Sequence, residues 1–170
     1  SYNSKVLSVM ELDDRSIANI EEHSNVENLS QYMTEGATEK PIYINELDKE
    51  KIAKQCPKLD KNEVPENIEA TFLHKSDITN WKERCPAITH KIRLNIATNS
   101  QLKRLFSEEE LAIIDSVQKE HGIITSIEQL QSQFPAERIE FIQQNTELKM
   151  DAKYASAKEL SKIPQLNPNT

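Results

Sequence analysis

Residues 92–106 read IRLNIATNSQLKRLF, and residues 42–56, fifty positions earlier, read IYINELDKEKIAKQC. The two stretches share an asparagine and a set of apolar positions. In the first stretch these are Ile44, Asn45, Leu47, Ile52 and Cys56, and in the second they are Leu94, Asn95, Ala97, Leu102 and Phe106. A period of this length indicates one supersecondary unit that is built twice.

The correspondence continues after a one-residue slip. Val64, Ile68, Ile78, Trp81, Cys85 and Pro86 recur forty-nine positions later as Ile113, Val117, Ile127, Leu130, Phe134 and Pro135. An unrelated helical bundle is the alternative interpretation, because apolar residues of any amphipathic helix recur at intervals of three and four.

The composition favours helices. The chain has 170 residues, of which 36% are apolar, and its only glycines are Gly36 and Gly122. We therefore predict an all-α protein with two tandem units. The expected segments are an acidic helical N-terminal segment (1–40), a first unit (41–92), a second unit (93–150), and a C-terminal helix with a disordered tail (151–170).

Capping residues predict short helices in the second unit. Thr98 caps a first helix, Ser107 with Glu110 forms a capping box for a helix over 108–121, and Gly122 ends it. Thr125 with Glu128 predicts a second capping box, and Pro135 begins a last helix.

The first unit and the chain ends predict similar elements. The first unit is expected to hold a helix over 48–55, a helix that begins at Pro65 and a helix capped by Asp77, and each unit opens with an extended piece, 42–45 or 92–95. Toward the ends, Asp13 or Asp14, Asn25 and Asp151 are the expected helix caps, and residues 165–170 are expected to be disordered.

Charge constrains the partners. The net charge is −7, and residues 1–42 contain 3 basic against 8 acidic residues. This balance repels polyanions and makes the N-terminal segment a docking element for a basic partner. We expect no membrane span in the chain, and a signal or anchor removed before Ser1 would leave no trace in the sequence.

The run Leu94 to Thr98, followed by Leu102, Leu105, Ala112, Ile113, His121, Gly122 and residues 126–130, carries a resemblance. It resembles the tandem helix-hairpin-helix unit of ComEA-like competence DNA receptors and is similar to the helical domain of the type II secretion minor pseudopilin K. The resemblance covers residues 93–145, and it reaches residues 43–92 through the internal repeat. It implies a bacterial protein of secretion or competence machinery, and DNA binding by glycine-containing turns between helices.

The turns that correspond to those DNA-binding corners lack glycine. They are the corners at 56–59, 85–88, 106–109 and 134–137. Proline removes a backbone donor, and glutamates occupy the place of a phosphate. We therefore expect the corners to contact proteins, through Pro57, Lys58, Pro86, Ala87, Ser107, Glu108, Glu109, Pro135, Ala136 and Glu137. For the nucleic-acid alternative, the candidate phosphate contacts are Lys103, Arg104 and Lys119.

Cys56 and Cys85 occupy the positions of Phe106 and Phe134 in the other copy. Two buried apolar side chains are the favoured interpretation, and a disulfide is the next one. Free cysteines would indicate the cytoplasm, and a bridge would indicate a periplasmic or secreted protein.

No motif points to catalysis, a cofactor or a metal. The four histidines, His23, His74, His90 and His121, show no metal-ligand spacing. The prediction is a non-enzymatic interaction or scaffold module that binds protein partners, with a nucleic-acid-binding module as the alternative. An enzyme would need an apolar cleft with converging carboxylates.

Overall fold

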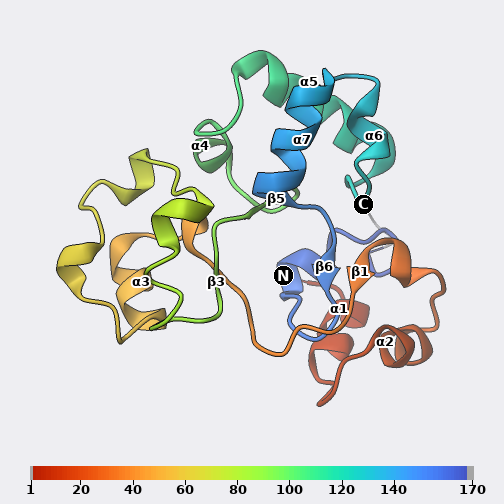
Figure 1. Ribbon diagram of the computed structural model, residues 1–170. Coiled ribbons are helices and arrows are strands. Elements are labelled where there is room, and N and C mark those ends of the chain that lie inside the picture. The colour runs from red at the N-terminus through yellow and green to blue at the C-terminus, as the bar shows by residue number, and fades with distance from the viewer. Residues whose placement is uncertain (1, 168–170) are drawn as a thin grey trace.

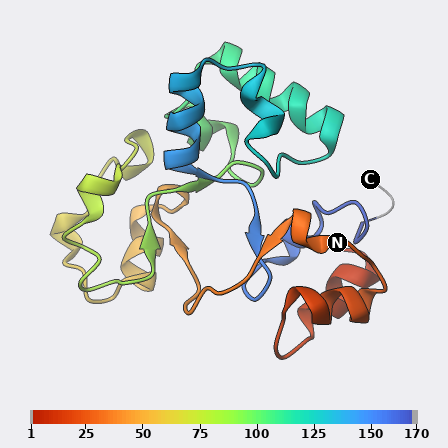
Figure 2. The ribbon, with the colours of Figure 1, turned by 45° about the vertical axis from the view of Figure 1, so that its right-hand side comes forward.

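Three pairs of very short parallel strands organise the chain, which the computed structural model describes over residues 2–167 (Figure 1). Strand β1 (Met33–Thr34) pairs with β6 (Met150–Asp151), β2 (Ile42–Tyr43) with β3 (Ile88–Thr89), and β4 (Ile92–Arg93) with β5 (Thr146–Glu147). The pairs β2–β3 and β4–β5 each join the beginning of one helical unit to its end, and β1–β6 joins segments from the two ends of the chain. Three units therefore surround a common centre, and the views in Figures 1 and 2 agree on this arrangement.

The prediction of an all-α fold is wrong. Helices make up 45% of the structure and strands 7%, so the fold is mixed α/β. The extended pieces at 42–45 and 92–95 were expected, but their pairing with residues 88–89 and 146–147 was not. Strands of two residues are too short to show the alternation that identifies a strand in a sequence.

The first unit (42–89) is built mainly from single turns. Asp48 caps the helix α3 (Lys49–Gln55) by accepting a hydrogen bond from the backbone of Lys51. The remaining turns are 3₁₀ helices: η2 (Ile44–Glu46), η3 (Lys61–Glu63), η4 (Ile68–Ala70) and η5 (Lys75–Ile78). The helix expected after Pro65 is thus a single 3₁₀ turn, η4. Asp77 does not cap a helix as expected, because it lies inside η5, where its side chain accepts the backbone N–H of His74. The apolar residues of both turns still enter one core with Ile44, Ile52, Val64 and Trp81.

The second unit (92–147) has longer helices. They are α4 (Asn99–Leu102), α5 (Glu108–His121), α6 (Glu128–Gln131) and α7 (Ala136–Asn145). The capping box of Ser107 with Glu110 is present, and Thr98 forms a second one with Gln101. Gly122 ends α5 at φ +86°, a backbone conformation that favours glycine. The box expected for Thr125 with Glu128 is replaced, because Gln129 accepts the backbone N–H groups of Thr125 and Ser126.

The third unit, which we call the terminal unit, combines both ends of the chain. Its N-terminal half contains α1 (Ser4–Met10), α2 (Ile17–Ser24) and η1 (Leu29–Gln31), and its C-terminal half contains α8 (Ala157–Leu160). One core joins the halves and includes Val6, Val9, Ile20, Leu29, Leu160, Ile163 and Leu166. Figure 2 shows the two halves side by side.

Four expectations for the chain ends are corrected. Ser16 rather than Asp13 or Asp14 caps α2, since its hydroxyl accepts from the backbone of Asn19. Asn25 ends α2 in a left-handed conformation instead of opening a helix, and Ser156 caps α8 in place of Asp151, which lies in β6. Leu166, expected in the disordered tail, is fully buried. Residues 168–170 of that tail lie outside the described residues.

Two asparagines play the same part in the first two units. Asn45 accepts a hydrogen bond from the backbone of Leu73 and donates to the carbonyls of Leu73 and His90. Asn95 accepts from Ile124 and donates to the carbonyls of Ile124 and Leu148. Each asparagine therefore ties the opening of its unit to the middle of that unit and to the residue directly after its last strand. In the terminal unit, the position that corresponds to these asparagines is occupied by a lysine, Lys153.

Candidate functional site

Arg93, at the end of β4, joins the three units at the centre of the molecule. Its guanidinium contacts Glu46 of the first unit at 2.7 Å and Glu159 of the terminal unit at 2.8 Å. The side chains of Glu46 and Glu159 are only 7% and 8% exposed. Two buried carboxylates therefore depend on one arginine for their charge compensation.

Tyr43 completes this centre. The ring of Tyr43 lies under the Arg93 guanidinium at 4.3 Å, and its hydroxyl donates to Glu147 at 2.7 Å. Burial and the neighbouring carboxylate of Glu147 raise the pKa of Tyr43 far above its usual value, so the phenol stays neutral. Burial alone would lower the pKa of Arg93, but Glu46 and Glu159 together outweigh it and raise this pKa.

A cleft of about 930 Å³ opens beside Arg93, and we call it the central cleft. All three units contribute to it. Its apolar lining includes Met10, Ile42, Leu47, Ile96, Ala155 and Ala157, and its charged lining consists of Arg15, Lys40, Arg93, Lys153, Lys158, Glu46, Asp151 and Glu159. This volume is at the upper end of the range found for ligand pockets.

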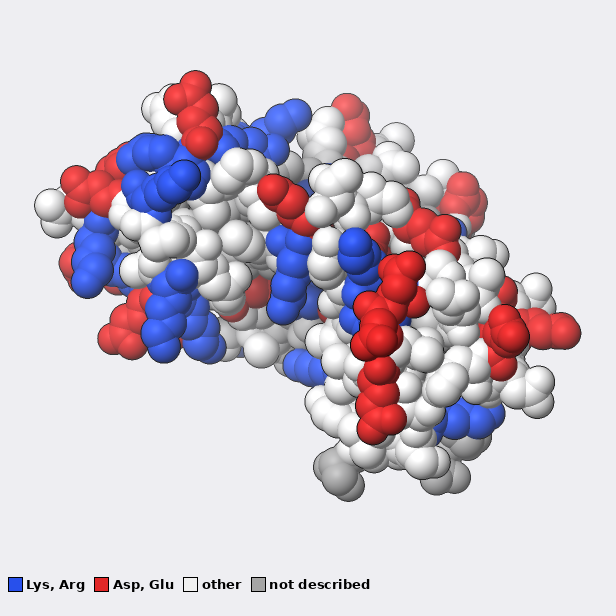
Figure 3. All heavy atoms as spheres, turned by 90° about the horizontal axis from the view of Figure 1, so that it is seen from below, with Lys and Arg blue, Asp and Glu red and all other residues white. Residues whose placement is uncertain are grey.

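A second hollow of about 620 Å³ is lined by part of the connection between β1 and β2, by Tyr43 and by the end of β5. Its charged residues are Glu39, Lys91, Glu147, Lys149 and Asp151. Seen from below, the surface is indented between the left and right parts of the view, and several Lys and Arg side chains lie along the indentation (Figure 3).

The predicted corners do not converge on the central cleft. Pro86 and Ala87 line the second hollow, whereas the corners at 56–59, 106–109 and 134–137 line neither of the two. At the corner of Ser107, the backbone N–H groups of Ser107 and Glu110 are bonded to the side chains of the capping box. Glu108 and Glu109 are exposed beside it. This corner therefore presents carboxylates, and two of its backbone donors are already bonded.

The three candidate phosphate contacts differ in their surroundings. Arg104 reaches into the first unit, where it donates to the carbonyls of Asn45 and Thr71, and burial lowers its pKa. Lys119 pairs with Asp115 at 3.0 Å, and Lys103 is exposed. Arg104 thus holds two units together.

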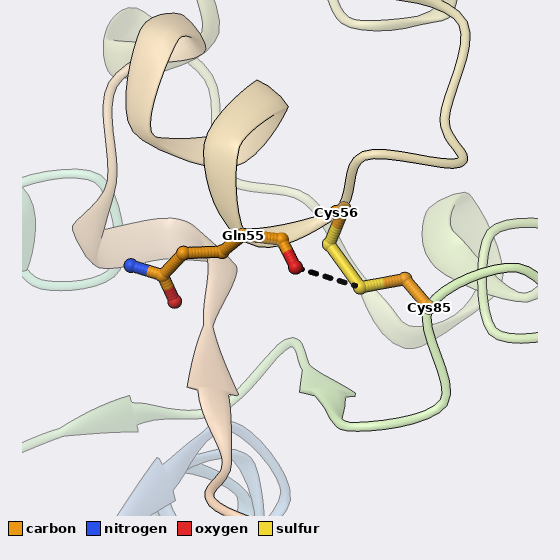
Figure 4. The surroundings of a disulfide bond; sticks show 3 residues. All are labelled: Gln55, Cys56 and Cys85. Carbon is orange, nitrogen blue, oxygen red and sulfur yellow. Dashed lines mark hydrogen bonds between the residues drawn. A yellow bond between two sulfur atoms is a disulfide. The ribbon is translucent and has the colours of Figure 1, made fainter.

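Cys56 and Cys85 form a disulfide, which was the second interpretation after two buried apolar side chains (Figure 4). The bridge joins the end of α3 to the segment before β3, with Cα atoms 5.5 Å apart. Both cysteines are buried, as expected from their match to Phe106 and Phe134. Within residues 2–167 no group of three or more His, Cys, Asp or Glu side chains could hold a metal ion, and no helix is long and apolar enough to cross a membrane.

The sequence interpretation missed the central residues Tyr43, Glu46, Arg93 and Glu159. One signal was available, because Arg93 interrupts an apolar extended piece directly before the repeated Leu94 and Asn95. A charged side chain at such a position needs a partner if the piece is buried.

Comparison with known proteins adds no relative: no family model, no curated protein and no solved structure matches the chain.

Proposed function

We propose that the chain is a non-enzymatic protein-interaction module that serves as a scaffold within a larger assembly. The observation that carries the proposal is the open central cleft, where three units meet around one ionic centre. Exposed apolar side chains lie next to it on α1, where Leu7 is 50% and Met10 is 41% exposed, and Met10 itself lines the cleft. Exposed apolar surface beside a cleft is typical of a protein-binding site.

The resemblance to tandem helix-hairpin-helix units supports a place in secretion or competence machinery. DNA binding receives less support. The capping box at Ser107 occupies two backbone N–H groups of this corner, and the adjacent Glu108 and Glu109 are exposed carboxylates that would repel a phosphate. The disulfide fits an oxidising compartment, which favours a periplasmic or secreted protein.

Point variants test this function better than removal of the acidic segment. Residues 6–33 supply half of the core of the terminal unit, so their removal would expose the other half. The variant Leu7→Glu/Met10→Glu changes only exposed positions. We expect the intact chain, immobilised on a resin, to retain a protein partner saturably and this variant to retain less of it.

The matched control is Ala112→Glu, which changes an exposed position of α5 that lines neither hollow. Circular dichroism establishes that both variants are folded. A mobility assay with a short DNA duplex at about 50 mM salt tests the alternative, because phosphate contacts are strongest at low salt. Retention of the duplex without any protein partner would contradict the proposal.

A further inference from the structure

We propose that the central cleft binds an extended peptide segment in which acidic and apolar residues alternate, supplied by the partner protein. This inference rests on the proposed interaction function and adds the chemistry of the ligand. It is carried by the charge balance of the cleft, by its apolar lining and by the buried ionic centre whose residues also line it.

The cleft is locally basic in an acidic protein. Five basic residues line it, Arg15, Lys40, Arg93, Lys153 and Lys158, against the three acidic residues Glu46, Asp151 and Glu159, whereas the whole chain has a net charge of −7. Five minus three gives a local balance of +2. An anionic ligand is therefore attracted to this cleft in particular.

Four of the five basic residues have no carboxylate partner among the described residues. Within residues 2–167, Arg15, Lys40, Lys153 and Lys158 form no ion pair, while Arg93 compensates Glu46 and Glu159. The third acidic residue, Asp151, accepts hydrogen bonds from the backbone of Lys153 and Tyr154. The three carboxylates are thus bonded within the protein, whereas four of the cationic groups form no ion pair within residues 2–167.

The position of Arg15 shows that one of these cations is fixed. Its guanidinium donates twice to the carbonyl of Lys153, at 2.7 and 3.2 Å, which connects the two halves of the terminal unit. Burial lowers its pKa despite the nearby Asp151 and Glu159. A fixed guanidinium loses less entropy on binding a carboxylate than a mobile lysine does.

The apolar residues of the cleft account for the apolar side chains of the proposed peptide. The terminal unit lines the cleft with both kinds of side chain, the basic Arg15, Lys153 and Lys158 and the apolar Met10, Ala155 and Ala157. The first and second units add the apolar Ile42, Leu47 and Ile96. Successive side chains of an extended peptide point to opposite sides. A peptide with alternating glutamate and leucine would therefore present carboxylates and apolar groups together to a cleft that is lined by both basic and apolar residues.

The probe is a fluorescein-labelled octapeptide of alternating glutamate and leucine, and its binding to the full chain is followed by fluorescence anisotropy. We expect saturable binding that weakens as salt is added. Octapeptides with glutamine or lysine in place of glutamate should bind at least about tenfold more weakly, because they lack the negative charges. Equal binding of the glutamine peptide would overturn the proposal.

Two double variants locate the site. Lys153→Glu/Lys158→Glu reverses two charges of the cleft, and Lys82→Glu/Lys103→Glu reverses two exposed lysines that do not line it. Both change the net charge equally. We expect the first variant to lose at least about tenfold in affinity and the second to bind like the original chain. Equal losses of affinity in both variants would show that binding depends only on net charge, and would overturn the proposal that the cleft is the binding site.

A photo-crosslinking residue identifies the surface directly. Gln55 lines the cleft, and Gln131 is exposed on α6 and does not line it. Placed at position 55, the crosslinker should capture the octapeptide, and placed at position 131 it should not. If a short DNA duplex competes with the octapeptide and is captured at position 55, the ligand of the cleft is a polyanion and not a peptide. This outcome would overturn the proposal.

Failure of this inference is distinguishable from failure of the proposed function. If a protein partner is retained equally by the intact chain and by Lys153→Glu/Lys158→Glu, the interaction function stands and the cleft is not its site. If neither the octapeptide nor any protein is retained, both proposals fail.

Discussion

Asn45 and Asn95 are single side chains that each hold one unit together. Asn45 makes three hydrogen bonds to the backbone of residues 73 and 90, and its side chain is buried. Asn45→Ala leaves the N–H of Leu73 without its partner. We expect the free energy of unfolding to fall by about 2–4 kcal/mol, measured by urea denaturation. The exposed Asn80→Ala is the control, and a similar loss in both variants would contradict this role.

Glu110 gives one part of the stability a pH dependence. Burial alone would raise the pKa of Glu110, but hydrogen bonds from Arg138 and Ser107 outweigh it and hold the pKa below its usual value. A lowered folded-state pKa stabilises the protein above the unfolded-state pKa, and this stability is lost as the pH falls through the folded value. The advantage of the original chain over Glu110→Gln should therefore shrink between about pH 5 and 3.

The measurement is the free energy of unfolding of both proteins at each pH. Glu109→Gln, an exposed change in the same helical turn, serves as the control and should show no such convergence. A difference between the original chain and Glu110→Gln that stays constant down to pH 3 would refute the role given to Arg138.

Only some of the side chains that stabilise the structure could be predicted from the sequence. The repeated asparagines and the caps Thr98 and Ser107 could be predicted, because each acts through neighbours in the chain or recurs in the repeat. Arg93 could not be assigned, since its partners are 47 and 66 residues away. Only the fold brings Glu46 and Glu159 to the same guanidinium.

Among the elements, the first unit depends on its disulfide more than its sequence suggests. It contains one α-helix, α3, and otherwise single 3₁₀ turns, whereas the second unit has the 14-residue α5. The bridge closes a loop with a sequence separation of 29. In the chain-entropy description, a loop of this size contributes about 3–4 kcal/mol.

Cys56→Ala/Cys85→Ala should therefore weaken the first unit in particular. We expect faster amide hydrogen exchange over residues 42–89 and little change over residues 108–145. Reduction of the original chain should reproduce this pattern, while the same reductant should leave the double variant unaffected. Equal effects on both units would show that the bridge does not act locally.

The strands mark the limit of prediction at this scale. Each strand has two residues and pairs with a partner 46 to 117 positions away, as in Ile42 with Ile88 and Met33 with Met150. A local pattern cannot encode such a partner, so the helices of the second unit were predicted and the mixed class was missed.

At the scale of the whole molecule, the terminal unit repeats the plan of the other two. Ser156 caps α8 three residues after Lys153, as Thr98 caps α4 three residues after Asn95, and Leu160 is buried like Leu102. This spacing was visible in the sequence. It was read as an isolated helix because the rest of the unit lies at the other end of the chain.

The ionic centre should determine how the three units hold together. Arg93→Met leaves the buried carboxylates of Glu46 and Glu159 without compensation, and we expect a loss of about 3–5 kcal/mol in stability at pH 7. The triple variant Arg93→Met/Glu46→Gln/Glu159→Gln should recover part of it. Arg84→Met, which removes an arginine paired with Glu63 on the surface, is the control and should cost much less, because solvent screens an exposed ion pair.

The union of the two chain ends gives the most direct test of the architecture. Ile20 on α2 is fully buried in the core that α2 shares with Leu160, Ile163 and Leu166. Ile20→Ala creates a cavity there and should cost about 2–5 kcal/mol. Because the core is shared, hydrogen exchange should accelerate over residues 150–166, far away in the sequence, and stay unchanged over residues 42–89. Ile52→Ala, in the core of the first unit, should show the reverse pattern. Acceleration confined to residues 2–34 in Ile20→Ala would mean that the two ends fold separately.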